Sequence, residues 1–303
     1  MLRGNSAAPA DLGPYRRRGP LREHGYTLDL FHRPPMTTTG NPLLDMTDAM
    51  TTYTGDEDVP DETFRDTALP GFKQALTARR SIRVFDGEPI PDEVMKDCLC
   101  DATLAPSSSN LQPYELYWVR DSTTRERLAE ACLGQPAATT AGELVVVVAR
   151  RDLWSTNLDK VWDLMTEGGR KTFPKPVDDY YHKITPRLRQ TDSLGLGNLM
   201  RRVLFWFRGR SAPTPRSPVN TGDHRVWAHT QSCLAAMTFM LSLTAHGYDS
   251  CPIGGLDKLR IRRLLGLPHQ AEVTMVIAAG TRRPEGLYGA RVRLPYEDLI
   301  KEV

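Results

Sequence analysis

The order of the elements that the sequence predicts indicates a mixed fold of the α/β or α+β class. Two apolar runs, residues 116–119 and 144–149, have the length of strands. The second run reads Leu-Val-Val-Val-Val-Ala without alternation, a pattern typical of a central strand that is buried on both faces. Helical patterns come before the first run, and further helical and strand patterns follow the second.

Three helices and a third strand complete the predicted core. A short helix ends at Arg79-Arg80, and a second runs from Pro91 to about Ala105, because a proline followed by acidic residues favours a helix start. A long helix rich in Ala, Leu and Met covers 226–247 and ends at a glycine, as helices often do. Residues 273–279 then form another apolar strand.

Residues 1–70 predict an N-terminal extension, largely disordered, in front of a domain at 71–303. Proline and glycine interrupt the extension throughout, and it has no sustained hydrophobic periodicity. Its first 35 residues are basic, whereas residues 45–66 are acidic. Because the first 35 residues differ so much from a folded domain, Met36 is a candidate for the true start of the chain.

Residues 155–225 predict an insertion, or lid, within the domain. This segment holds 13 Lys and Arg against 7 Asp and Glu, an excess of six positive charges. In its middle, residues 194–210 mix large apolar side chains with arginines. Three interpretations stay open for that stretch: a helix packed on its own domain, the wall of a substrate pocket, or a helix that contacts a membrane surface.

The overall composition excludes several classes of protein. The 39 Lys and Arg nearly balance the 37 Asp and Glu, so no global field attracts the chain to nucleic acid or to an anionic membrane. The five cysteines are an odd number in a large chain, which favours a reducing compartment over a disulfide scaffold. No apolar stretch has the length of a spanning helix, and no secretion signal is apparent. A cytoplasmic location is expected.

Three separated clusters carry groups that suit a planar, anionic ligand. Residues 79–85, Arg-Arg-Ser-Ile-Arg-Val-Phe, place three guanidinium groups beside a hydroxyl, and arginine forks match phosphate oxygens. Residues 105–113 are a loop of short hydrogen-bonding side chains, and residues 251–256 contain paired glycines that let backbone amides approach a ligand. Each cluster alone has an ordinary alternative, either a solvated basic face or a turn.

Together and in this order, the clusters resemble the nitroreductase family of flavoenzymes. The similarity runs from about Phe72 to Val303, interrupted by the insertion, and its most specific parts are residues 79–85, 106–114 and 291–295. The resemblance implies an α+β fold with a central, mainly antiparallel sheet flanked by helices. It also implies a homodimer that binds FMN at the subunit interface.

The resemblance further implies which residues bind the cofactor. The first motif of the family holds the phosphate and ribityl chain of FMN, which implies contacts for Arg79, Arg80, Ser81 and Arg83. Arg83 would also lie near the flavin pyrimidine and stabilise negative charge at N1 and C2=O on reduction. Further contacts, the first four of them across the subunit boundary, are implied for Pro106, Ser107, Ser108, Asn110, Gln135 and Gln231.

Two more segments are implied to complete the flavin site. Their members are Pro252, Ile253, Gly254, Gly255, Arg291 and Arg293. The residues 252–255 would form a turn over the isoalloxazine ring, with the backbone N–H groups of Gly254 and Gly255 near N5 or O4; these two glycines and Arg83 are the implied catalytic positions. Many family members carry an acidic residue where Gly254 stands, so the preference between NADH and NADPH stays open.

The function implied is that of an NAD(P)H-dependent FMN oxidoreductase with a ping-pong mechanism. Hydride would pass from NADPH or NADH to the flavin, which would then reduce a nitroaromatic, a quinone or a similar aromatic or hydrophobic acceptor, since the insertion is rich in Trp, Tyr and Phe. Two alternatives stay open: a flavin-dependent oxidase or dehydrogenase of a biosynthetic pathway, and a non-catalytic flavin-binding accessory protein docked on a membrane.

No metal site and no dinucleotide fingerprint are predicted. His224 and His229 are five residues apart, which does not match the spacing of ligand pairs on one helix face. The segment Gly195-Leu196-Gly197 lacks a third glycine and a preceding strand.

Overall fold

The computed structural model describes residues 64–189 and 196–303. The prediction of a disordered extension falls mostly on residues 1–63, outside the described part. A sheet of four strands forms the centre: β1 (Tyr114–Val119), β2 (Glu143–Arg150), β3 (Asp249–Ile253) and β4 (Ala271–Gly280). The strand order is β1-β2-β4-β3, and each neighbouring pair is antiparallel.

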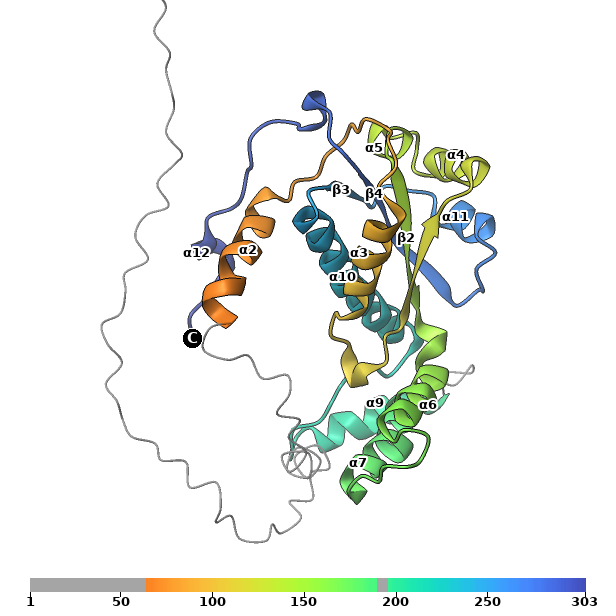
Figure 1. Ribbon diagram of the computed structural model, residues 1–303. Coiled ribbons are helices and arrows are strands. Elements are labelled where there is room, and N and C mark those ends of the chain that lie inside the picture. The colour runs from red at the N-terminus through yellow and green to blue at the C-terminus, as the bar shows by residue number, and fades with distance from the viewer. Residues whose placement is uncertain (1–63, 190–195) are drawn as a thin grey trace, which may run out of the picture. The chain divides into compact units, whose positions relative to one another are not determined.

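Helices cover both faces of this sheet (Figure 1). Helices α3 (Asp92–Thr103) and α10 (Thr221–Ala245) pack on one face, where Val145 and Val147 of β2 point. Helices α4 (Ser122–Ala131), α5 (Pro136–Thr139) and α11 (Lys258–Leu264) pack on the other, where Leu144, Val146 and Val148 point. The prediction of a strand buried on both faces is confirmed, as is the α+β fold with an antiparallel sheet.

Several element boundaries differ from the predictions. Helix α10 begins at Thr221 rather than near residue 226, because the side chain of Asn220 caps it by accepting a hydrogen bond from the backbone N of Asp223 at 3.0 Å. Helix α2 (Phe64–Ala78) begins before residue 71 and contains Pro70, which removes one backbone donor without ending the helix. Helices α4 and α11 and strand β3 were not predicted.

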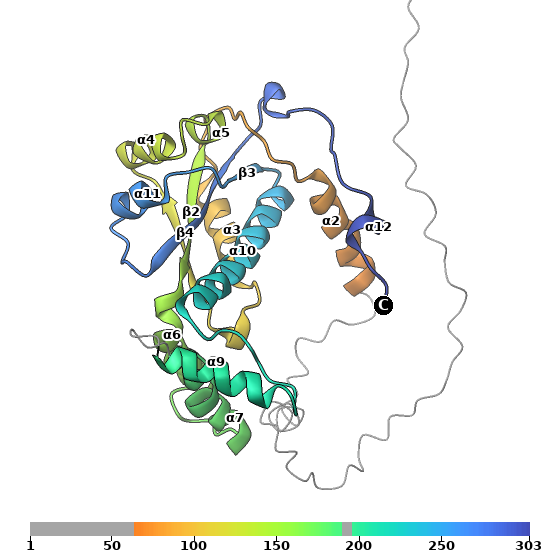
Figure 2. The same cartoon turned by 180° about the vertical axis from the view of Figure 1, so that it is seen from behind.

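The segment predicted as an insertion lies between β2 and α10. It contains α6 (Trp154–Met165), α7 (Lys175–Asp179), a π-helical turn at Tyr180–Ile184, α8 (Thr185–Arg189) and α9 (Leu196–Arg208). A small apolar core of its own joins it to Leu111, and the buried members are Leu111, Leu158, Val161, Val177 and Tyr181. Figure 2 shows α6, α7 and α9 at one end of the sheet.

Helix α9 is apolar on a side that the described chain does not bury. Six large side chains are exposed on it: Leu199, Met200, Val203, Leu204, Trp206 and Phe207. The residues that the structure describes leave this side of the helix uncovered, and the interpretation of a helix packed on its own domain stays a prediction. The interpretations of a pocket wall and of a membrane contact stay predictions as well.

Short elements complete the chain. Single helical turns form at Ser108–Asn110, Arg151–Leu153 and Pro284–Gly286, and α12 is Tyr296–Leu299 near the C-terminus. All five cysteines are free. Among the described residues, no helix is both long enough and apolar enough to cross a membrane.

Candidate functional site

Two arginine segments that lie far apart in the sequence form one pocket, which we call the arginine cradle. It has a volume of about 230 Å³, and its lining consists of Arg79, Arg80, Ser81, Arg83, Leu287, Tyr288, Ala290, Arg291, Val292 and Arg293. None of these lining residues is acidic. The structure thus brings together the first predicted motif and the predicted C-terminal pair, and it leaves their charges without a carboxylate in the pocket wall.

Backbone contacts hold the first motif in place. Ile82 is fully buried, and its backbone N donates to the carbonyl of Ser250 at the start of β3, at 3.1 Å. The backbone N of Arg83 donates to the carbonyl of Gly286 at 2.8 Å. At Gly286 a Cβ atom would lie only 2.3 Å from the carbonyl oxygen of Val84, so only glycine allows this close approach.

Two arginines of the cradle, Arg291 and Arg80, donate hydrogen bonds to backbone carbonyls. Nη2 of Arg291 donates to the carbonyls of Thr77 at 2.7 Å and Arg79 at 2.8 Å, and Nη2 of Arg80 donates to the carbonyl of Gly289 at 2.9 Å. Desolvation, followed by the charges of Arg293, Arg80 and Arg79, lowers the pKa of Arg291. An anion in the cradle would relieve the repulsion among these guanidinium groups.

A second group of predicted contacts meets at the end of β3. Nε2 of Gln135 donates to the carbonyl of Gly255 at 2.7 Å and to the carbonyl of Cys132 at 3.0 Å. The amide of Gln135 therefore fixes the orientation of the peptide that follows Gly255. A Cβ atom added at Gly254 would meet no atom within 4 Å, so this residue faces open space and a larger side chain would fit there.

The predicted turn at residues 252–255 is partly wrong. Pro252 and Ile253 belong to strand β3, which pairs with β4, and only Gly254 and Gly255 lie beyond its end. The side chain of Ile253 is buried in the core, so it is not available to a ligand. Pro252 is tolerated because β3 is an edge strand, where a missing backbone donor does not interrupt the sheet.

The third group is the loop at residues 107–112, between α3 and β1. Ser109, Asn110 and Gln112 all have positive φ angles, of 57°, 54° and 43°, which marks a tightly bent backbone. The side chain of Ser107 accepts from the backbone N of Gln112 at 3.0 Å. The backbone N of Ser108 donates to Oε1 of Gln231 on α10 at 2.8 Å, so two residues predicted to contact the flavin bind each other.

Two contacts of this loop were not predicted. The hydroxyl groups of Ser109 and Tyr180 are hydrogen-bonded at 2.7 Å, and Nη2 of Arg189 donates to Oγ of Ser108 at 3.0 Å. Tyr180 and Arg189 both belong to the insertion. The excess of positive charge and the aromatic content of the insertion were the sequence signals for such a role, and neither predicted these two contacts.

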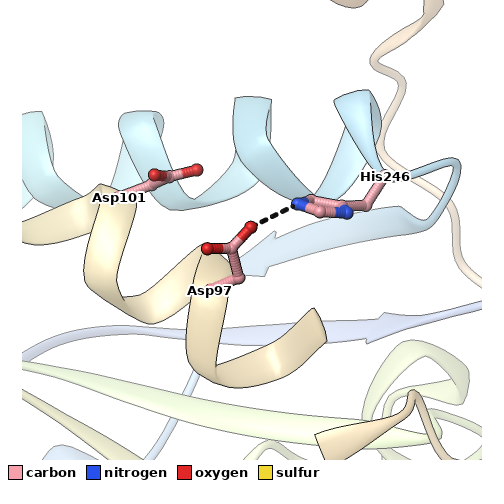
Figure 3. Close-up of side chains that lie close together, drawn as sticks. All are labelled: Asp97, Asp101 and His246. Atoms are coloured by element: carbon pink, nitrogen blue, oxygen red, sulfur yellow. Dashed lines mark hydrogen bonds and ion pairs between the residues drawn. The ribbon is translucent and has the colours of Figure 1, made fainter. Parts of the chain in front are cut away.

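A further polar cluster lies away from the predicted contacts, between α3 and the end of α10. Figure 3 shows Asp97, Asp101 and His246, whose potential ligand atoms lie within 4.8 Å of one another. Nε2 of His246 lies 3.0 Å from Oδ2 of Asp97, and the hydroxyl of Ser242 donates to Asp101 at 2.6 Å. These partners make it a hydrogen-bond network that joins α3 to the end of α10.

The fold and the arginine cradle define an α+β protein with a pocket lined by five arginines and no acidic residue. Comparison with known sequences identifies it further. The model of the nitroreductase family matches residues 76–281, and the chain belongs to this family. The resemblance predicted from the motifs is confirmed.

Individual relatives agree with this assignment. A protein of Thermus thermophilus named "NADH dehydrogenase" is 30% identical over 228 residues, covering 75% of this chain and 94% of the relative. YdgI of Bacillus subtilis, whose name places it among the NAD(P)H nitroreductases, is 29% identical over 76% of this chain and 96% of its own. A protein of Exiguobacterium sibiricum solved in complex with FMN is 26% identical, covers 77% of this chain and 97% of its own, and superimposes with a TM-score of 0.58.

Proposed function

We propose that this chain is an FMN-dependent oxidoreductase that takes hydride from NAD(P)H and reduces an aromatic or hydrophobic organic acceptor. The arginine cradle is the observation that carries the proposal, because a pocket lined by five arginines and no carboxylate suits a phosphate dianion. Family membership and the relatives named for NAD(P)H chemistry support it. The relative solved with FMN supports the identity of the cofactor.

In this proposal the arginine cradle holds the phosphate of FMN. Arg79, Ser81 and Arg293 contact the phosphate or the ribityl chain, and Arg291 closes the cradle from the C-terminal segment. The glycines after β3, with the peptide fixed by Gln135, lie beside the isoalloxazine ring. Bound FMN supplies the acceptor and donor of hydride, while the protein positions it and balances its charge.

Arg83 is proposed to stabilise the charge that develops on reduction. Its guanidinium group lies 5.1 Å from the centre of the Tyr288 ring, and its Nη1 donates to the carbonyl of Ser81 at 3.2 Å. These two contacts restrict a side chain that is otherwise exposed. A positioned guanidinium at this place would favour the anionic reduced state over the neutral oxidised state.

The proposal includes a homodimer in which each flavin is shared. Among the described residues, hydrogen bonds link side chains to partners within three separate groups: the arginine cradle, Gln135 with Gly255, and Ser108 with Gln231. In this part of the chain no hydrogen bond joins one of these groups to another. Large apolar side chains are exposed on α10 and on α2: Val226, Leu234, Met237, Phe64 and Phe72. Exposed apolar surface on these two helices is what a subunit interface would cover.

Cofactor binding tests the proposal directly. We expect purified protein to be yellow or to take up FMN, and anaerobic NADPH or NADH to bleach the flavin absorbance near the visible maximum. The variants Arg79→Ala and Arg293→Ala should each weaken FMN binding by about 10- to 100-fold, because each removes a charge-assisted hydrogen bond to the phosphate. Arg127→Ala, an exposed arginine on α4, is the matched control.

The outcomes separate the alternatives. A protein that takes up no FMN contradicts the proposal, and unchanged affinity in both cradle variants contradicts the phosphate assignment. Bound flavin that NADPH and NADH leave oxidised would favour the oxidase or the non-catalytic binding protein instead. Sedimentation at concentrations around the assay concentration tests the dimer, and a monomer that retains FMN would contradict sharing. The cytoplasmic location stays a prediction.

A further inference from the structure

Three buried polar atoms without a hydrogen-bond partner lie on neighbouring side chains next to the loop at residues 107–112, which we call the serine loop. In the described part of the chain, five buried side-chain N or O atoms have no such partner, and three of them are Nη1 of Arg189, Nε1 of Trp227 and Nε2 of His224. The guanidinium carbon of Arg189 lies 3.7 Å from the centre of the Trp227 ring, and the rings of Trp227 and His224 are 6.4 Å apart. The side chains of Arg189 and His224 thus both lie against the indole of Trp227.

Arg189 brings a buried positive charge to this cluster. Only 6% of Arg189 is exposed, and no carboxylate among the described residues forms an ion pair with it. Burial lowers its pKa to about 10, which still leaves the guanidinium charged at neutral pH. The second terminal nitrogen of its guanidinium group, Nη2, already donates a hydrogen bond to Oγ of Ser108. A buried charge without a partner is costly, and native proteins normally provide one.

His224, the third side chain of the cluster, is neutral and therefore does not change its net charge. Burial, and next the charge of Arg189, lower the pKa of His224 to about 4, so the ring is neutral at pH 7. The nearest acidic residue on α10, Asp223, accepts a hydrogen bond from the backbone N of Val219 at 2.8 Å. The cluster therefore carries one net positive charge together with an indole donor.

We propose that Arg189, together with Trp227 and His224, binds a carboxylate or similar oxyanion carried by the electron acceptor. The inference rests on the proposed function and deepens it by naming the acceptor class: an aromatic compound with an anionic group. Arg189 is one hydrogen bond from Ser108, in the loop assigned to the flavin, so a group bound here lies close to that loop. Trp154, Trp162 and Tyr180, which pack in the insertion's core, provide aromatic surface nearby.

Paired acceptors that differ in charge test the proposal on the flavin-loaded protein. 4-Nitrobenzoate and 4-nitrobenzyl alcohol carry the same reducible group, and only the first is anionic. We expect the KM of wild type to be lower for 4-nitrobenzoate. Arg189→Gln should raise that KM by about 10-fold or more and leave the KM for the alcohol within about twofold, since one charge-assisted contact is removed. Arg189→Lys, which retains the charge, should recover part of the loss.

Arg187→Gln is the matched control, because Arg187 is an exposed arginine on the same helix, α8. It should change neither KM. FMN content and melting temperature are measured for every variant, so that a misfolded protein is recognised. Equal effects of Arg189→Gln on both acceptors would mean that the residue only orders the serine loop, and this result would overturn the proposal.

A binding measurement separates this inference from the proposed function. Benzoate, which carries the anion but has nothing to reduce, is titrated calorimetrically into wild type and Arg189→Gln. Binding that requires Arg189 supports the site even if NAD(P)H leaves the flavin oxidised, and absence of benzoate binding by wild type overturns it even if the flavin is reduced normally. Chloride, sulfate and acetate test whether a free anion, and not the electron acceptor, occupies the site. If they raise the melting temperature of wild type but not of Arg189→Gln, and the two acceptors are not discriminated, the occupant is a free anion and the acceptor assignment is wrong.

Discussion

Gly286→Ala tests whether the backbone beneath the arginine cradle is as tightly fitted as the structure indicates. The added Cβ would lie 2.3 Å from the carbonyl oxygen of Val84, 2.9 Å from Cγ2 of Ile82 and 3.0 Å from the backbone N of Val84. Two of these atoms are backbone, so they cannot move aside by a side-chain rotation. Since the carbonyl of Gly286 also accepts the bond from Arg83 N, any adjustment displaces the first motif.

The magnitude follows from the cost of overpacking. Forcing one extra methyl into a tightly packed place costs about 1–3 kcal/mol, and a clash with backbone falls toward the upper end. For a domain of this size each kcal/mol corresponds to roughly 2–4 °C, so the melting temperature of Gly286→Ala should fall by roughly 4–12 °C. FMN affinity should fall as well, because the arginines of the cradle are carried by the displaced segment.

Thermal unfolding and FMN titration measure the two effects. Gly71→Ala is the control: no atom lies within 4 Å of its Cβ position, and Gly71 is in helix α2, where alanine is the better helix former. We expect Gly71→Ala to keep or raise the melting temperature. If Gly286→Ala unfolds within about 1 °C of wild type and binds FMN as tightly, the argument from close backbone approach is refuted.

Two further predictions concern charge. Arg83→Ala should lower the midpoint potential of the bound flavin by about 30 mV or more, because about 1.4 kcal/mol of stabilisation of the reduced anion corresponds to 30 mV for a two-electron couple; spectroelectrochemistry that finds an unchanged or raised potential would contradict its proposed role. The pKa of His224 is about 4 in the folded protein against 6.5 in the unfolded chain. The contribution of His224 to the free energy of unfolding is therefore present in full above pH 6.5 and is lost as the pH falls toward 4. At pH 5 the loss is about 2 kcal/mol, and urea unfolding at pH 7 and pH 5 should show it in wild type and not in His224→Gln; equal losses in the two proteins would contradict the assignment.

The core of the fold could be predicted because its signal is local. The run at residues 144–149 is apolar at every position, and the structure buries alternate side chains of β2 in the two cores. Helix α4 was missed because its sequence, Ser-Thr-Thr-Arg-Glu-Arg-Leu-Ala-Glu-Ala, has little apolar periodicity. Strand β3 was missed because Pro252 and the two following glycines are typical of a turn, although an edge strand tolerates the proline.

The candidate site, unlike the core, could not be predicted from local sequence signals. About 200 residues separate Arg79 from Arg291, so no spacing rule places them in one pocket; the resemblance of the motifs to a family did so, and the cradle brings them together. The contact of Arg189 with Ser108 spans 81 residues and joins an insertion to a loop. Nothing in the local sequence distinguishes Arg189 from the exposed Arg187 two positions earlier, because burial depends on the tertiary fold.

The separation of the cradle from the serine loop within one chain has a genetic consequence. Under the proposed sharing, each flavin takes its phosphate contacts from one subunit and its serine-loop contacts from the other. A chain with a damaged cradle and a chain with a damaged loop would each form an inactive homodimer. In a mixed dimer of the two, both defects fall on the same flavin and the second flavin meets two undamaged halves. Two inactive alleles would therefore complement each other: each mixed dimer has one intact site of two, and random pairing of the two chains gives about a quarter of the normal number of sites.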